Sequence, residues 1–91
     1  MKQIHVWISG FVQGVGYRVF TSKEAKKWSF TGWVQNLPDG RVEAVIQADD
    51  ERKLKDFLSV LEKGSYFAQV RNIVVEWEDP TEIYSDFVIH R

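Results

Sequence analysis

The pattern of apolar and polar positions divides the chain into predicted strands and helices. Near its start, Ile4, Val6 and Ile8 alternate with other residues, which is the period of a half-buried strand that runs into Gly10. We predict four further strands, the last of them a short edge strand, over residues 31–37, 42–46, 70–77 and 87–89.

A helix is predicted between the strands over 42–46 and 70–77. Either Asp49 or Asp50 can cap its start, and Gly64 can close its end. The apolar residues between them fall at i, i+3, i+4 and i+7: Leu54, Phe57, Leu58 and Leu61. This spacing places one apolar stripe along the helix.

An earlier helix is predicted over residues 18–29, with lysines on one side and apolar residues on the other. The apolar positions are Phe20, Ala25 and Trp28. The strands over 31–37 and 42–46 are joined by a segment in which Pro38 fits the first corner of a turn and Gly40 supplies positive φ. We therefore expect a hairpin there.

The resulting order is β-α-β-β-α-β, with a short strand added at the end. Two helices that each carry one apolar stripe must dock on the same sheet. We expect an α+β, ferredoxin-like sandwich: an antiparallel four- to five-stranded sheet with both helices on one face. The length of 91 residues leaves room for one core, so residues 1–91 are expected to form a single domain. This fold hosts many functions, so function must be argued from a site.

Composition narrows the class of function. The formal net charge of −1 removes the global attraction that gathers nucleic acid or anionic lipid. No cysteine is present, which excludes disulfides, thiolate nucleophiles and soft-metal sites and suits a reducing compartment. No apolar run is long enough for a signal sequence or a membrane span, so we expect a cytoplasmic protein. The aromatic content of 14% is expected to enlarge a small core.

The most unusual segment is Gly10-Phe11-Val12-Gln13-Gly14-Val15-Gly16-Tyr17-Arg18, between the first strand and the first helix. First-turn amides lack helical partners, glycines let the backbone approach an anion, and a guanidinium fork matches two phosphate oxygens. The segment is not a Walker loop, Val19 breaks the dinucleotide fingerprint, and Val12 stands where a cysteine phosphatase needs its thiol. Spacing alone leaves two interpretations open: an anion site, or a structural turn with a solvated arginine.

A second feature is Asn36, near the end of the strand over 31–37. A buried side-chain amide needs partners, and strands generally avoid asparagine. Asn36 either caps the hairpin or holds a water molecule against a bound electrophile.

These two segments together resemble the paired signature of the acylphosphatases. The first is the segment from Gly10 to Arg18, and the second is Gly32-Trp33-Val34-Gln35-Asn36-Leu37-Pro38-Asp39-Gly40-Arg41-Val42-Glu43. The resemblance spans essentially the entire chain, including its length and element order. It implies hydrolysis of an acyl phosphate to a carboxylate and inorganic phosphate, with no metal, no cofactor and no covalent intermediate.

By position, the resemblance makes Arg18 the substrate-binding arginine and Asn36 the residue that orients water. The backbone amides that would form the phosphate cradle are those of Gly14, Val15, Gly16, Tyr17 and Arg18. Tyr17 stands where phenylalanine is common in the family, a change expected to be neutral. The partner implied is a small-molecule acyl phosphate, with no nucleic acid and no membrane, and we expect a monomer.

General acids and bases are scarce. His5 lies inside the first strand and His90 next to the end, so neither is expected to be a catalyst. The chemistry tolerates this because a leaving carboxylate, with a pKa near ~4, departs unprotonated. The segment 49–51 is interpreted as a helix start, not a metal site. Two alternatives remain: an RNA-binding ferredoxin-like module that stacks bases on Trp7 or Trp33, and a catalytically silent anion-binding domain.

Overall fold

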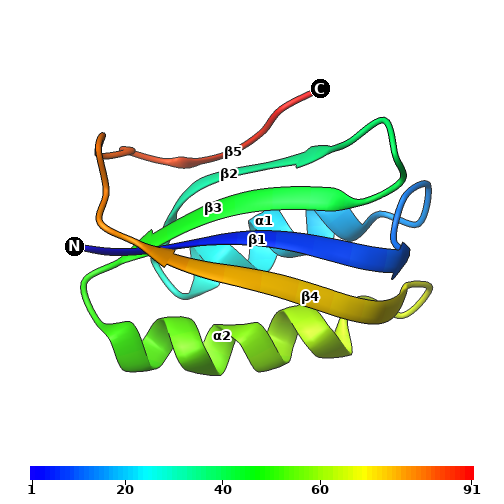
Figure 1. The fold of residues 1–91 in the computed structure, drawn as a ribbon, viewed down its shortest axis with the longest axis horizontal. Helices are drawn as coiled ribbons and strands as arrows, with labels where there is room; N and C mark the ends of the chain where they lie inside the picture. Colours follow the sequence, from blue (N-terminus) through cyan, green and yellow to red (C-terminus); the bar gives the residue numbers. More distant parts are fainter.

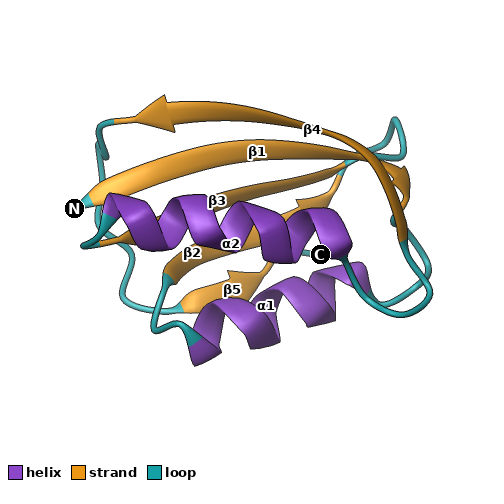
Figure 2. Ribbon diagram, turned by 90° about the horizontal axis from the view of Figure 1, so that it is seen from below, coloured by secondary structure: helices purple, strands orange, loops and turns teal.

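The computed structural model describes residues 1–91 and contains five strands and two helices (Figure 1). Their bounds are β1 Lys2–Phe11, α1 Tyr17–Lys27, β2 Thr31–Asn36, β3 Val42–Ala48, α2 Glu51–Lys63, β4 Gln69–Glu78 and β5 Phe87–Ile89. Every predicted element is present. The strands form one layer and the two helices cover the same face of it, as Figure 2 shows, so the predicted ferredoxin-like α+β class is confirmed.

The sheet has the order β4-β1-β3-β2-β5. The β1·β3, β1·β4 and β2·β3 pairs are antiparallel, but β5 pairs with β2 in parallel, so the sheet is mixed and not antiparallel throughout. The direction of β5 follows from the end of the sheet at which the chain crosses from β4 to the opposite edge. β4 ends at the end of the sheet where β2 begins, and the chain passes there to the far edge (Figure 1). A strand that starts from that end must run in the direction of β2.

The helix ends follow local chemistry. Asp50, not Asp49, caps α2, because its carboxylate accepts a hydrogen bond of 2.9 Å from the amide of Arg52. α1 ends two residues earlier than the predicted boundary at residue 29. Ser29 has a φ of 61°, and the amide of Phe30 reaches back to the carbonyl of Ala25 at 2.9 Å. This left-handed residue and its return bond form a Schellman-type end.

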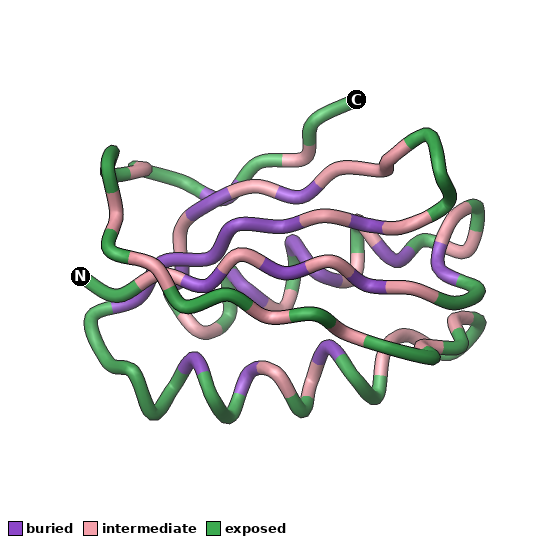
Figure 3. The backbone as a smooth tube through the Cα atoms, in the orientation of Figure 1, coloured by how far each residue is buried: buried purple, intermediate pink, exposed green.

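The core lies between the sheet and the helices, along the inner faces of the central strands and α2 (Figure 3). The alternating residues Ile4, Val6 and Ile8 are fully buried, as their spacing predicts. From the facing helix, the stripe contributes the buried Leu54, Phe57 and Leu61. Neither helix combines the length and apolar character that crossing a membrane would require.

The prediction that aromatic residues enlarge the core is correct for part of them only. Phe30, Phe57 and Phe87 are buried, whereas no tryptophan is. Trp7 occupies a position of β1 that alternates with the buried residues, so it faces away from the helices. On β1, parity along the strand, more than residue size, therefore keeps an aromatic side chain out of the core.

Candidate functional site

The element order brings the two sequence segments to one end of the sheet. β1 and β2 both run antiparallel to β3, so they point in the same direction and their carboxyl ends lie at the same edge (Figure 1). The loop that follows β1, residues 12–16, is called the glycine loop here. Asn36 is the last residue of β2 and pairs with Val42 of β3.

The glycine loop is anchored at its two ends and open between them. Val12 and Tyr17 are each 1% exposed. Between them, Gly14 and Gly16 have φ values of 76° and 77°, and a Cβ added at either would meet no atom within 4 Å. These glycines are required by their positive φ and not by crowding, and they leave the backbone accessible from outside.

The backbone amides of the glycine loop have no partner within the protein. The backbone hydrogen bonds outside regular elements include none donated by residues 14–18. Gly16 occupies the N-cap of α1 and offers no side-chain cap, and the first turn carries no acidic residue. A row of free N–H groups at the positive end of a helix favours an anion.

Arg18 and Asn36 both line a hollow of about 90 Å³ beside this row. Its lining consists of Val12, Gly14, Gly16, Tyr17, Arg18, Val19 and Asn36. Arg18 is half-buried, and its Nη1 donates to the backbone oxygen of His90 at 3.3 Å. One guanidinium nitrogen is thus directed toward the chain end, and the remaining donors are free to bind oxygen atoms.

The structure does not use Asn36 as a cap of the hairpin. The turn is closed by backbone bonds, from the amide of Leu37 to the oxygen of Arg41 at 2.8 Å and from the amide of Gly40 to the oxygen of Leu37 at 3.1 Å. The Oδ1 atom of Asn36 is buried and has no hydrogen-bond partner. A buried carbonyl oxygen needs a donor, and Asn36 is one of the residues that line the hollow, so a water molecule bound there is a candidate partner.

Of the residues predicted for the site, Gly14, Gly16, Tyr17, Arg18 and Asn36 line the hollow, and Val15 lies in the loop without lining it. The ring of Tyr17 belongs to the core, where its hydroxyl donates to the carbonyl of Leu61 at 2.6 Å and burial raises its pKa. His5 lies away from this hollow, bonded to Glu43 at 2.7 Å on the sheet face opposite the helices.

Two contacts of the site were not predicted from the sequence. The His90 carbonyl that accepts from Arg18 is a main-chain group and leaves no signal in the residue pattern. The second contact is made by Gln13, whose side chain donates to two carbonyls of the β2–β3 hairpin. This residue does leave a signal in the sequence. A glutamine among glycines and valines suggests a side-chain bond to backbone, although its partners cannot be read from spacing.

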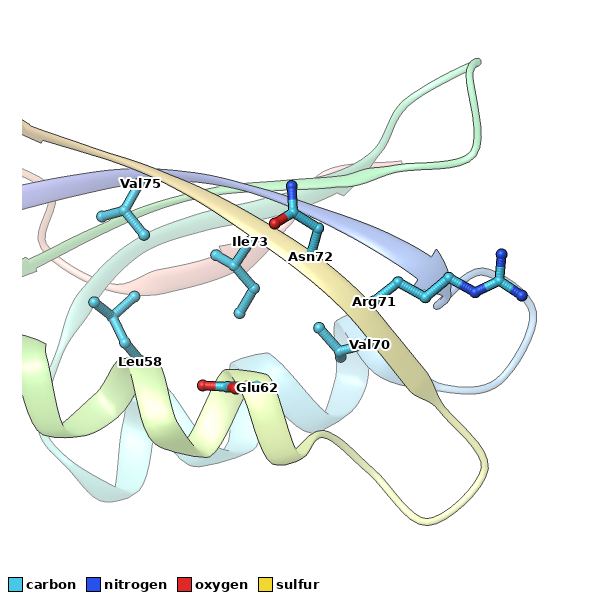
Figure 4. A pocket seen from close by; sticks show the side chains of 7 residues that line it. All are labelled: Leu58, Glu62, Val70, Arg71, Asn72, Ile73 and Val75. Carbon is cyan, nitrogen blue, oxygen red and sulfur yellow. The ribbon is translucent and has the colours of Figure 1, made fainter.

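The largest hollow of the molecule, of about 330 Å³, lies elsewhere. It lies between α2 and the edge strand β4, and its lining combines apolar side chains such as Leu58 and Ile73 with the polar Glu62, Arg71 and Asn72 (Figure 4). None of its lining residues has a buried side-chain polar atom without a hydrogen-bond partner. The chain also has no cluster of three or more His, Asp or Glu side chains arranged to hold a metal ion.

Comparison with known proteins identifies the family of the chain. Residues 4–89 match the sequence model of the acylphosphatase family. An acylphosphatase of Thermococcus kodakarensis is 46% identical over 82 residues, which cover 88% of this chain and 89% of that protein. The crystal structure of the acylphosphatase from Bacillus subtilis superposes with a TM-score of 0.95 at 37% identity, covering 100% of both chains. That of an acylphosphatase from Coxiella burnetii gives 0.90 at 37% identity, covering 98% of this chain and 92% of the other. The chain therefore belongs to the acylphosphatase family, which confirms both the resemblance seen in the sequence and the predicted enzyme class.

Proposed function

We propose that the chain hydrolyses acyl phosphates at the hollow between the glycine loop and the end of β2, without a metal ion. The observation that carries this proposal is the pairing at one hollow of Arg18 with the buried, unpartnered Oδ1 of Asn36. Arg18 and the free amides of residues 14–18 bind the phosphoryl oxygens. Asn36 accepts a hydrogen bond from the attacking water.

The reaction divides between these two groups. Phosphoryl transfer passes through a loose, in-line transition state in which charge spreads over the equatorial oxygens, so positioning and electrostatic stabilisation supply most of the catalysis. The water oxygen forms a new bond to phosphorus, the bond from phosphorus to the acyl oxygen breaks, and the electron pair leaves with the carboxylate. The water proton ends on the phosphate or in solvent.

No general acid is needed for the leaving group, and this predicts selectivity. A carboxylate has a pKa near ~4 and leaves unprotonated, whereas an alkoxide must be protonated as it departs. No His, Asp or Glu side chain lines the hollow. The enzyme should therefore cleave acyl phosphates well and alkyl phosphate monoesters poorly.

The test is release of phosphate from benzoyl phosphate in the presence of excess chelator. Replacing Arg18 by alanine should abolish measurable turnover, and Asn36→Ala should lower kcat by about 10²- to 10³-fold with little change in the inhibition constant of inorganic phosphate. Arg71→Ala and Asn72→Ala are matched controls, because both residues are exposed on the edge strand β4.

Near-normal rates in folded Arg18 and Asn36 variants would remove the proposed mechanism. A requirement for added Mg²⁺ would contradict the metal-free reaction. Loss of activity in the Arg71 or Asn72 control would show that the assay reports stability instead of chemistry.

The site also bears on the partners. Arg18, Asn36 and the row of amides lie at one hollow without a residue from a second copy, so we propose that a monomer is the catalytic unit, to be checked by light scattering of the active enzyme. The open sheet face does carry Trp7 and Trp33, but Glu43 and Glu78 lie there around His5. Carboxylates on that face repel nucleic acid phosphates, so RNA binding is not favoured.

A further inference from the structure

The side chain of Gln13 connects the glycine loop to the hairpin that carries Asn36. Its Nε2 donates to the backbone oxygen of Leu37 at 2.8 Å and to that of Arg41 at 2.9 Å. Both N–H groups of the amide are thereby used. The two acceptors stand on opposite arms of the hairpin, separated from Gln13 by 24 and 28 positions of sequence.

These acceptors flank the position of Asn36. Leu37 follows Asn36 directly, and Arg41 precedes Val42, which is the partner of Asn36 across the β2–β3 ladder. A shift of the hairpin neck relative to Gln13 therefore moves the Asn36 side chain by a similar amount. Gln13 is in turn next to Gly14, the first residue of the amide row.

The glycine loop has few other means of holding that separation. Gly14 and Gly16 contribute no side chain, and the space beside them is open. The buried Val12 and Tyr17 fix the loop to the core at its ends but do not connect it to the hairpin by a hydrogen bond. Among the hydrogen bonds of this structure, those of Gln13 are the ones that join the loop to the hairpin.

The same bonds are not needed to satisfy the hairpin. The oxygen of Leu37 also accepts from the amide of Gly40, and that of Arg41 also accepts from the amide of Leu37. Removing Gln13 leaves neither carbonyl without a partner, so the stability lost is limited to that of the two bonds themselves. What the bonds add beyond stability is a fixed geometry between two parts of the site.

We propose that Gln13 is a positioning residue that sets the distance between the phosphate-binding amides and the water held by Asn36. This inference rests on the proposed function of the same site. In-line attack requires the water on the axis through phosphorus, and a misplacement of about 1 Å can lower a rate by about 10²-fold. Phosphate binding itself depends on the loop amides and Arg18, which stay together within one segment.

The experiment compares Gln13→Leu, which keeps the size of the side chain and removes its donors, with the enzyme itself. We expect kcat for benzoyl phosphate to fall by about 10- to 100-fold, while the inhibition constant of inorganic phosphate changes by less than about threefold. Gln35→Leu is the matched control, because Gln35 lies on β2 beside Asn36 but bonds only Glu43. It should keep its rate within about twofold.

A double-variant cycle separates positioning from a general structural effect. If Gln13 acts through Asn36, Gln13→Leu should add little further loss to Asn36→Ala, because the aimed water is already gone. If the fold-losses in kcat of the two single variants multiply in the double variant, the proposal is overturned. An unchanged kcat in Gln13→Leu would also overturn it, as would a loss of phosphate binding as large as the loss of rate.

Folding is checked by circular dichroism, and Gln13→Asn serves as a second variant that keeps an amide but is too short to bridge both carbonyls. If neither variant folds, Gln13 is a stability residue and the positioning role is wrong. Failure of the proposed function is a separate result, since then the unmodified enzyme itself would release no phosphate from benzoyl phosphate.

Discussion

The hydroxyl of Tyr17 provides a sharp test of how the site is supported, because it can be removed without touching the chemistry. Tyr17 is the first residue of α1 and is 1% exposed. Its hydroxyl donates to the oxygen of Leu61 at 2.6 Å, in the last turn of α2, where carbonyls lack helical partners. We predict that Tyr17→Phe destabilises the protein while leaving its catalytic rate within about twofold.

The magnitude follows from the orphaned carbonyl. Leu61 is fully buried, so its oxygen loses its donor without gaining water. Leaving a buried acceptor unsatisfied costs roughly 1–3 kcal/mol. For a loss of about 2 kcal/mol, a domain of this size should melt about 8–16 °C lower. The midpoint of urea unfolding should fall by about 1–2 M.

Alkaline pH gives an independent check of the same bond. Burial raises the pKa of the Tyr17 hydroxyl above its ordinary value of about 10, so the unfolded chain releases this proton before the folded protein does. The stability that the neutral hydroxyl contributes is fully present below about pH 10 and is lost as the pH rises above it. The difference in unfolding free energy between the enzyme and Tyr17→Phe should therefore shrink by about 1.4 kcal/mol at pH 11.

The assay is urea unfolding followed by tryptophan fluorescence at pH 7 and pH 11, with phosphate release measured at pH 7. Tyr66→Phe is the control, because Tyr66 is 94% exposed. This variant should have the same unfolding midpoint as the enzyme at both pH values. An unchanged midpoint in Tyr17→Phe at pH 7, or a free-energy difference that does not shrink at pH 11, would refute the reasoning.

Three further changes test the fold that carries the site. Asp50→Ala removes the cap bond to the Arg52 amide and should cost about 1 kcal/mol in urea unfolding, whereas Asp49→Ala should cost little. Gly32→Ala should prevent folding, because Gly32 has a φ of 139° and a Cβ there would overlap the Val45 carbonyl oxygen of the neighbouring strand. Circular dichroism of the variant checks this. Phe57→Ala empties the centre of the helix–sheet interface and should lower the unfolding free energy by about 3–5 kcal/mol in the same assay.

Sequence reasoning succeeded where the signal is local. The stripe of α2 and the alternation of β1 reflect the geometry of one element, so spacing alone identifies them. The same is true of the glycine loop, because positive φ and free amides are properties of a few consecutive residues. Asn36 is a residue type that strands generally avoid, which marked it as a candidate site residue. In the structure its Oδ1 atom has no hydrogen-bond partner, so no structural bond explains its place in the strand.

The predictions that failed concern relations between distant elements. The parallel direction of β5 depends on where the chain crosses the sheet after β4, and no residue of β5 carries that information. Trp28 reaches the side of the core while Trp7 stays on the open face, although both are large and apolar. The bond from the Tyr17 hydroxyl to the end of α2 likewise joins distant elements, and the expectation that Tyr17 is equivalent to phenylalanine stays a prediction, to be tested by Tyr17→Phe.

Short spans of residue types were enough to predict the elements, the glycine loop and the family. The pairing of Arg18 and Asn36 at one hollow, the bridge from Gln13 to the hairpin and the bond from Arg18 to the His90 carbonyl became visible only in the folded chain. Those contacts arise because β1 and β2 both pair with β3, so their carboxyl ends coincide. Side chains far apart in the sequence become neighbours only through the pairing and packing of the whole sheet, which no local period encodes.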